Sequence, residues 1–232
     1  MHLVLIPGFW LDGSSWDAVA APLRAAGHTV HALTLPGLES RTADRSNIGL
    51  RHHVDAVVAV VDSLPDPVVL VGHSGGGAIA HAVVDARPDR VARVVYVDSG
   101  PLADGGVIND ELPVVDGEVP LPDWSVFDDE DLVDLDDDLR EKFRGMAIPQ
   151  PAGVASDKQQ LRDERRYDVP VTVVACEFSS DALRGWMEKG HPHVSELTKI
   201  KDVELVDLPT GHWPQLTRPA DLAAAILKAI DR

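Results

Sequence analysis

A glycine-rich turn between an apolar run and a helix constrains this chain more than any other part of its sequence. Residues 72–76 read G-H-S-G-G, with the apolar run Pro67–Val71 before them and the glycine- and alanine-rich segment Gly75–Ala86 after them. A serine in this G-x-S-x-G pattern stands at a sharp strand-to-helix turn, and its Oγ projects above the end of the strand. The crowded turn needs very small neighbours, here Gly72 and Gly76. The pattern therefore predicts that Ser74 is a nucleophile.

Apolar runs alternate with amphipathic segments on both sides of this turn. Helices are expected near Trp16–Ala26, Leu50–Leu64, Gly75–Ala86 and Asp221–Ile230. Strands are expected at Leu3–Ile6, His28–Leu35, Pro67–Val71, Val91–Val97, Val169–Ala175 and Val203–Leu208. Largely apolar strands that suit burial on both faces and alternate with helices favour a mostly parallel sheet covered by helices on both faces. The predicted fold class is therefore α/β, with about six strands in one sheet.

Residues 101–167 interrupt this alternation, because they contain several prolines and no strong strand. Within them, Asp128–Asp138 holds eight acidic residues among eleven. Apolar residues nevertheless recur there at helical spacing: Leu132, Leu135, Leu139 and Phe143. This pattern predicts a helix with one buried stripe and a solvated acidic face. We expect a core domain of residues 1–100 and 168–232, with residues 101–167 inserted after the strand that ends near Val97 as a small helical lid.

The net charge and the cysteine content exclude several classes of function. The chain of 232 residues has a formal net charge of −17, so phosphate backbones and anionic membrane surfaces would repel it. Neither nucleic acid nor a membrane is therefore an expected partner. Cys176 is the only cysteine, which leaves no internal disulfide and no cysteine-rich metal cluster. Because no secretory signal or membrane-spanning run is visible either, we expect a cytoplasmic protein.

The base that activates Ser74 should be a histidine at the same edge of the sheet. The chain has ten histidines, and their positions relative to the strands decide among them. Only His212 follows the last expected strand, in a loop before the final helix. This gives the chain order of serine then histidine that the geometry requires. The side chain of His73 is expected to point away from the Ser74 Oγ. Carboxylate or cysteine partners at metal spacing are missing for His52-His53 and for His191-x-His193, so no metal site is expected.

Two backbone N–H groups are expected to bind the oxyanion that forms when Ser74 attacks a carbonyl. One belongs to Gly75, the residue after the nucleophile, at a helix N-terminus whose dipole favours negative charge. The other should come from the loop after the first strand, Pro7–Trp10, where Phe9 is the best candidate. Together these groups would form an oxyanion hole.

These features resemble the α/β-hydrolase family, and its capped serine esterases and lactonases in particular, over nearly the whole chain. The resemblance is carried by Ile6–Phe9 with Trp16, by Gly72–Gly76, and by Gly211-His212 with the following Trp213–Leu222. It implies a serine hydrolase with a catalytic triad and no metal or organic cofactor. Where the family has eight strands, six are expected here. Pro7-Gly8 also replaces the His-Gly of many members, although the turn itself is retained.

The acid of the triad departs from the family pattern. The family usually places it three residues beyond the position of Cys176, where this chain has Ser179. A serine cannot orient and stabilise an imidazolium as a carboxylate does. Asp98, directly after the run Val91–Val97, is the preferred substitute, and a minority of family members place the acid there. Glu177 is the alternative acid, because its longer side chain begins two residues before the usual position.

The predicted reaction is acyl transfer to water through an acyl-enzyme on Ser74. The wall of the substrate pocket is expected to include Trp10, Trp124, Phe127, Trp186 and Trp213. An apolar, aromatic wall favours a small or medium, largely apolar ester or lactone, so the expected partner is a small-molecule substrate. Two alternatives stay open: a receptor on the same fold with slow or no hydrolysis, and a carbon–carbon hydrolase or lyase with the same triad. A homodimer is left open as well.

Overall fold

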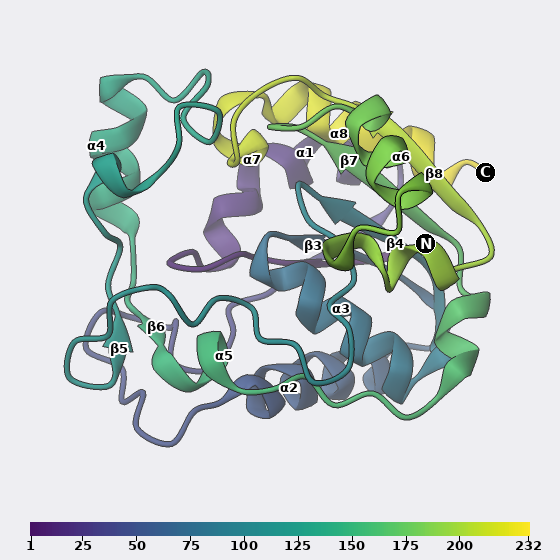
Figure 1. Ribbon diagram of the computed structural model, residues 1–232, viewed down its shortest axis with the longest axis horizontal. Coiled ribbons are helices and arrows are strands. Elements are labelled where there is room, and N and C mark those ends of the chain that lie inside the picture. Colours follow the sequence, from purple (N-terminus) through teal and green to yellow (C-terminus); the bar gives the residue numbers. More distant parts are fainter.

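Six parallel strands form the centre of the protein. The computed structural model describes residues 1–232. The strands are β1 (His2–Ile6), β2 (Thr29–Ala32), β3 (Val68–His73), β4 (Val91–Val97), β7 (Val171–Ala175) and β8 (Val203–Asp207). They are ordered β2-β1-β3-β4-β7-β8, and each neighbouring pair is parallel (Figure 1). This confirms the α/β class and the sheet of six strands.

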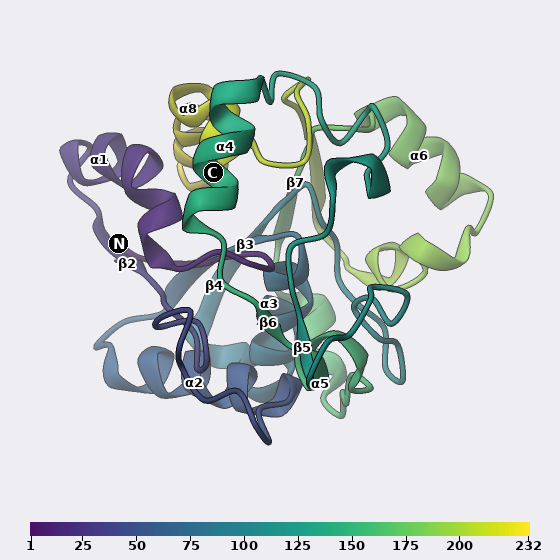
Figure 2. The same ribbon diagram turned by 90° about the vertical axis from the view of Figure 1, so that its left-hand side faces the viewer.

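Helices cover both faces of the sheet. One face is covered by α1 (Asp17–Ala25) and α8 (Pro219–Ile230), and the other by α2 (Leu50–Ser63) and α3 (Gly75–Ala86) (Figure 1 and Figure 2). Side chains of β1 alternate between these faces, with Leu3 on the α1 side and Val4 on the α2 side. Both are fully buried. Burial on both faces explains why apolar residues dominate the central strands.

The segment 101–167, which we name the insertion, lies between β4 and β7. It contains the helices α4 (Asp137–Met146) and α5 (Ala152–Ser156), and a small antiparallel pair of strands that the sequence did not predict, β5 (Glu118–Val119) and β6 (Gln150–Pro151). In Figure 1, α4 lies at one end of the molecule, apart from α8, while β5, β6 and α5 lie near α2. The buried apolar residues of the insertion all belong to the core on the α2 and α3 side of the sheet.

The acidic helix of the insertion begins later than the apolar spacing predicted. It starts after Asp136, whose Oδ1 accepts a hydrogen bond from the backbone N–H of Leu139 at 2.9 Å. A side-chain oxygen that caps a helix in this way fixes its first turn, so Leu132 remains in the turns before the helix. Leu135 and Phe143 are nevertheless buried, at 2% and 0% exposure, as the stripe predicted.

Two further helices follow the late strands: α6 (Ser180–Glu188) after β7, and α7 (Pro214–Thr217) before α8. Short 3₁₀ helices cover Gly13–Trp16, Pro88–Arg90, Trp124–Val126, Glu164–Asp168, Pro192–Val194 and Leu197–Lys199. None of the helices combines the length and the apolar character that crossing a membrane requires. The carboxyl ends of β3, β4, β7 and β8 all point to the edge that carries the insertion, and ligands of open α/β sheets bind at that edge.

Candidate active site

Ser74 sits at the turn between β3 and α3 in a strained backbone conformation, with φ 51° and ψ −126°. Only glycine fits two residues before it and two residues after it. A Cβ at Gly72 would lie 2.6 Å from the carbonyl oxygen of Gly76, and a Cβ at Gly76 would lie 2.6 Å from that of Ile6. The glycines expected from the motif are therefore required by close backbone contacts, and the turn presents the serine side chain at the carboxyl edge of the sheet.

His212 lies in the loop after β8 and connects Ser74 to an acid. Its Nε2 is 2.8 Å from the Ser74 Oγ, and its Nδ1 is 2.7 Å from the Oδ2 of Asp98. Both distances fit hydrogen bonds, the second one charge-assisted. Because the carboxylate can only accept, Nδ1 carries the proton and Nε2 is free to accept the serine proton. The structure thus brings together three residues that are far apart in the sequence.

Asp98 is held in place by its backbone and by two further hydrogen bonds. It directly follows β4, has a positive φ of 43° and is only 3% exposed. Its Oδ1 accepts the backbone N–H of Cys176 at 3.0 Å and that of Glu177 at 3.2 Å. These donors lie at the end of β7, next to β4 in the sheet. The carboxylate is therefore oriented by main-chain groups, with Oδ2 directed at His212.

Glu177 places a second carboxylate beside the same imidazole. Its Oε2 is 3.5 Å from the His212 Nδ1, beyond ordinary hydrogen-bond length. This oxygen is buried and has no hydrogen-bond partner. Ser179 has a different role, because its Oγ accepts the backbone N–H of Ala182 at 3.1 Å and caps α6. The position where the family usually carries its acid is thus a helix cap in this chain.

These carboxylates control the protonation of His212. Burial lowers the pKa of the imidazole, but the hydrogen bond to Asp98 and the nearby carboxylates of Asp98 and Glu177 outweigh burial, so the pKa of His212 is raised above its usual value. The insertion adds Asp131, whose own pKa is raised to about 6 by burial and by the carboxylate of Glu177. Three acidic side chains thus surround one histidine, and they favour the imidazolium that forms when a base takes up a proton.

The loop that carries His212 is fixed by neighbours that the sequence analysis did not identify. The insertion holds it from one side, because Val133 O accepts the N–H of Gly211 at 3.0 Å and Asp131 O accepts that of His212 at 2.8 Å. His73 holds it from the other side, since its Nε2 donates to the His212 carbonyl at 2.7 Å. The sequence gives no sign of the hydrogen bonds between the insertion and this loop, because they use only backbone groups.

His73 points away from the Ser74 Oγ, as expected, and is buried in the core. Its Nδ1 lies 3.2 Å from the side-chain Nε2 of Gln215, which can donate to it. Burial lowers the pKa of His73 to about 3, so the ring is neutral and can serve as donor on one nitrogen and acceptor on the other. The residue before the nucleophile therefore braces the loop of the base.

The two expected oxyanion donors lie close to Ser74. Gly75 is the first residue of α3, and a Cβ there would be 2.8 Å from the ring of Phe9. The loop after β1 passes so near the nucleophile that a Cβ at Gly8 would be 2.9 Å from the Ser74 Cβ. Phe9 follows in this loop, and its backbone N–H donates no hydrogen bond to the protein backbone. Both groups are thus placed near the space in front of the serine.

Ser74 and His212 open into a cavity of about 420 Å³. Its other lining residues are Gly75, Ala78, Asp98, Ser99, Gly100, Pro101, Leu102, Ile108, Glu177 and His193. The ligand atoms of Asp98, Glu177 and His212 lie within 4.8 Å of one another, which is a spacing that a metal ion could use. In the structure, however, His212 Nδ1 is engaged by Asp98 at hydrogen-bond length.

The aromatic residues expected to form the pocket wall occupy other places. Trp10, Trp124, Phe127 and Trp213 do not line this cavity but pack against one another and against Phe143, with ring centroids 5.2–6.0 Å apart. The indole of Trp10 is 5% exposed and donates from Nε1 to the carbonyl of Val119 at 3.0 Å. This cluster anchors the insertion on the core. Trp186 is the exception, because it lines a neighbouring cavity.

Known proteins share this sequence pattern and this fold. A model of the Alpha/beta hydrolase family matches residues 3–225. The Carbendazim hydrolyzing esterase of Nocardioides sp. is 34% identical over 100 residues, which cover 42% of this chain and 41% of that esterase. The Pyrethroid hydrolase of Sphingobium wenxiniae is 26% identical over an alignment of 265 residues that covers 99% of this chain and 87% of that enzyme. An extracellular alpha/beta-hydrolase from a Paenibacillus species shares the fold, with a TM-score of 0.79, 23% identity and coverage of 99% of this chain and 98% of that one.

Proposed function

Because this chain belongs to the alpha/beta hydrolase family and its homologues are carboxylic ester hydrolases, we propose that it cleaves a small or medium, largely apolar ester or lactone, with Ser74 as nucleophile. The observation that carries the proposal is the continuous hydrogen-bonded chain from Ser74 Oγ through His212 to Asp98. A serine activated by a histidine that an acid orients is the arrangement that acyl transfer uses.

The first half of the reaction forms an acyl-enzyme. His212 Nε2 takes the proton of the Ser74 hydroxyl while Oγ forms a bond to the carbonyl carbon. The N–H groups of Phe9 and Gly75 stabilise the negative charge on the carbonyl oxygen. When the tetrahedral intermediate collapses, His212 Nε2 gives its proton to the leaving alkoxide oxygen and the ester C–O bond breaks. In the second half, water attacks the acyl-enzyme by the same route and releases the acid.

In this proposal, Asp98 is the acid of the triad. Its Oδ2 is within hydrogen-bond range of His212 Nδ1, whereas Glu177 Oε2 lies 3.5 Å away. Asp98 is also held by two main-chain N–H groups, which preorganise it for this task. Glu177 then acts as a second negative charge that helps to stabilise the imidazolium without holding its proton directly.

The substrate class is supported by relatives and by the cavity. The relatives include proteins named for the hydrolysis of carbendazim and of pyrethroids. The cavity at Ser74 includes Ala78, Pro101, Leu102 and Ile108, and its volume of about 420 Å³ suits a small or medium molecule. Glu177 is the more exposed of the two carboxylates that line this cavity, at 26% side-chain exposure against 0% for Asp98, and an uncharged substrate meets no electrostatic repulsion from it.

A stopped-flow burst assay with p-nitrophenyl acetate tests the proposal. The parent protein should release about one equivalent of p-nitrophenol per protein in a fast phase, followed by slower turnover. Ser74→Ala and His212→Ala should lose the fast phase while keeping the circular dichroism spectrum of the parent. Val114→Ala, at a residue that is 57% exposed and lines neither cavity, serves as the control.

Three outcomes would contradict the proposal. Tight binding of small apolar ligands with no burst and no turnover would indicate a receptor. Cleavage of a β-diketone or a cyanohydrin without ester turnover would indicate carbon–carbon hydrolase or lyase chemistry. A burst that survives in Ser74→Ala would show that another residue is acylated.

A further inference from the structure

A second cavity opens beside the one that contains Ser74. It measures about 300 Å³ and shares five lining residues with the first: Ser99, Gly100, Pro101, Glu177 and His193. The residues that line only this second cavity are Phe178, Leu183, Trp186, Val194 and Leu197, all from the segment between β7 and β8. The space in front of the nucleophile therefore continues into one whose five unshared lining residues are all apolar.

The apolar wall combines buried aliphatic side chains with an aromatic rim. Leu183, Val194 and Leu197 are at most 6% exposed. The ring centroids of Phe178 and Trp186 lie 5.6 Å apart at an angle of 49°. Trp186 is 37% exposed, so its indole forms the outer edge of the cavity. Such a wall suits a flat or branched apolar group of a bound molecule.

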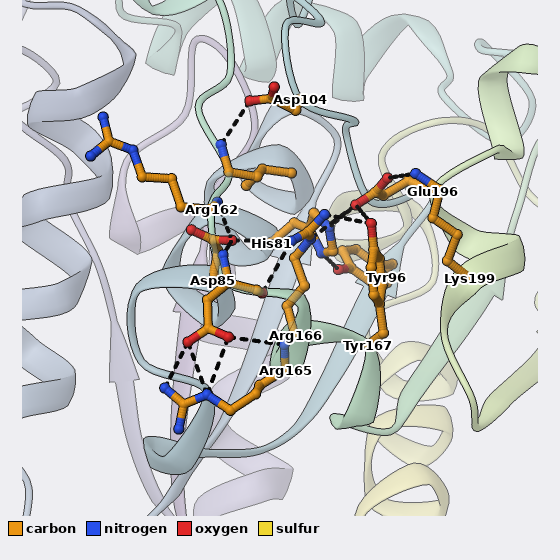
Figure 3. A network of polar contacts seen from close by, with 12 residues as sticks. His81, Asp85, Tyr96, Asp104, Arg162, Arg165, Arg166, Tyr167, Glu196 and Lys199 are labelled. Carbon is orange, nitrogen blue, oxygen red and sulfur yellow. Dashed lines mark hydrogen bonds and ion pairs between the residues drawn. The ribbon is translucent and has the colours of Figure 1, made fainter.

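A buried polar network holds this wall in a fixed position (Figure 3). Glu196 lies between Val194 and Leu197 in the chain and is 2% exposed. Its carboxylate accepts hydrogen bonds from His81 Nε2 at 3.2 Å, Arg166 Nε at 3.0 Å, Tyr167 OH at 2.9 Å and Lys199 Nζ at 3.0 Å. Because His81 belongs to α3, the network ties the cavity wall to the helix that begins beside Ser74. The cavity is therefore preformed.

The position of the cavity selects one half of an ester. His212 returns a proton to the leaving oxygen, so the alcohol half of the substrate has to lie beside the imidazole. Glu177, 3.5 Å from His212 Nδ1, lines both cavities, whereas His212 itself lines only the first, together with Gly75 and Ala78 of the nucleophile's helix. The second cavity thus adjoins the imidazole through Glu177 and lies apart from the oxyanion donor Gly75, and the first retains space for the acyl half.

We propose that the cavity lined by Leu183, Trp186 and Leu197 binds the alcohol half of the ester and that this half is an uncharged aryl or branched alkyl group. The inference rests on the proposed function and specifies its substrate class. Glu177 is the only acidic residue among the lining residues, and a carboxylate there disfavours a negatively charged group. Esters with a bulky apolar alcohol and a small acyl group are therefore the preferred substrates.

A pair of isomers tests this assignment, because benzyl acetate and methyl phenylacetate contain the same atoms with the ring on opposite sides of the ester bond. Hydrolysis is followed by pH-stat titration for the parent, Trp186→Ala and the control Val114→Ala. The parent should prefer benzyl acetate. Trp186→Ala should lower kcat/KM for benzyl acetate roughly tenfold and that for methyl phenylacetate less than about twofold. Trp186→Phe should restore most of the loss, since an aromatic ring remains.

A second comparison tests whether a negative charge on the alcohol half is disfavoured. It uses phenyl acetate and 4-acetoxybenzoate, whose leaving groups differ by one carboxylate. Phenyl acetate should be the better substrate of the parent, and the difference should shrink at high ionic strength. The inference fails if Trp186→Ala affects both isomers equally, if methyl phenylacetate is preferred, or if 4-acetoxybenzoate is the better substrate. The Ser74-dependent burst with p-nitrophenyl acetate is read separately, so the proposed function can stand while this inference fails.

Discussion

Replacing Asp98 by asparagine should remove catalysis through the protonation state of His212. The Oδ1 of Asp98 accepts two main-chain N–H groups, from Cys176 and from Glu177. In Asp98→Asn, the amide oxygen has to keep that place, because the amide nitrogen cannot accept. The side-chain NH₂ then faces the His212 Nδ1, which must accept its hydrogen bond. The imidazole proton therefore moves to Nε2. A protonated Nε2 has no free lone pair, so it can no longer accept the proton of Ser74.

The size of this effect follows from the cost of the opposite orientation. Turning the amide round would leave both main-chain donors without an acceptor, at about 1–3 kcal/mol for each. The orientation with the wrong histidine tautomer therefore dominates by about 2–6 kcal/mol, because two donors are involved. We expect kcat to fall by roughly 10²–10⁴-fold in this variant. Glu177→Gln should lose less than about tenfold, because its oxygen is not within hydrogen-bond range of His212.

The assay is steady-state hydrolysis of p-nitrophenyl acetate at saturating concentration by the parent, Asp98→Asn, Glu177→Gln and the double variant. Circular dichroism and thermal unfolding confirm that each variant is folded. The reasoning is refuted if Asp98→Asn keeps more than a tenth of the parent kcat while Glu177→Gln loses most of it. That result would make Glu177 the acid and would assign Asp98 to bracing the end of β7.

Three further outcomes follow from the same geometry. His212 must be neutral to act as a base, and the nearby carboxylates raise its pKa. The value of kcat/KM should therefore rise with pH through a midpoint above 6.5. Because Glu177→Gln removes one of these carboxylates, it should move that midpoint to lower pH. Burial and Glu177 raise the pKa of Asp131 from 3.8 to about 6, so the folded chain binds this proton more tightly than the unfolded one and stability falls as pH rises between these values. Asp131→Asn should hence unfold at a higher temperature than the parent at pH 7, with the difference disappearing near pH 4; an equal difference at both values would contradict this cause. Glu196→Ala leaves buried donors without their carboxylate and should lower the free energy of unfolding in urea by about 3–5 kcal/mol, whereas Lys199→Ala, at the exposed partner, should change it by less than about 1 kcal/mol.

The parts of the site that follow from local sequence could be predicted. Ser74 is such a case, because the crowding of its turn requires glycine at neighbouring positions and therefore leaves a pattern in the sequence. The strands were equally accessible, since burial on both faces makes most of their positions apolar. His212 could be selected because it follows the last strand. These inferences depend on residues that are close together in the chain.

The remaining features depend on contacts between distant segments. The choice between Asp98 and Glu177 rests on a positive φ and on main-chain N–H groups of a neighbouring strand, which leave no mark in the sequence. An aromatic residue of a pocket and one of a packed cluster look alike, so Trp124 and Trp213 were expected at the wall and lie in the cluster. The lid role and bounds of residues 101–167, the cytoplasmic location and the homodimer stay predictions.

The backbone pairing between the insertion and the base loop has a consequence for protein engineering. Asp131 and Val133 offer their carbonyl oxygens to His212 and Gly211, and a Cβ at Gly211 would lie 2.2 Å from the Asp131 oxygen. A chimaera that exchanges the insertion for that of a relative would thus replace the segment that accepts the backbone hydrogen bonds of the His212 loop. Transplants that carry residues 128–134 together with residues 209–213 should keep their turnover, while transplants of the insertion alone should fold and lose it. The unit of exchange between relatives is thus a pair of segments that are distant in the chain.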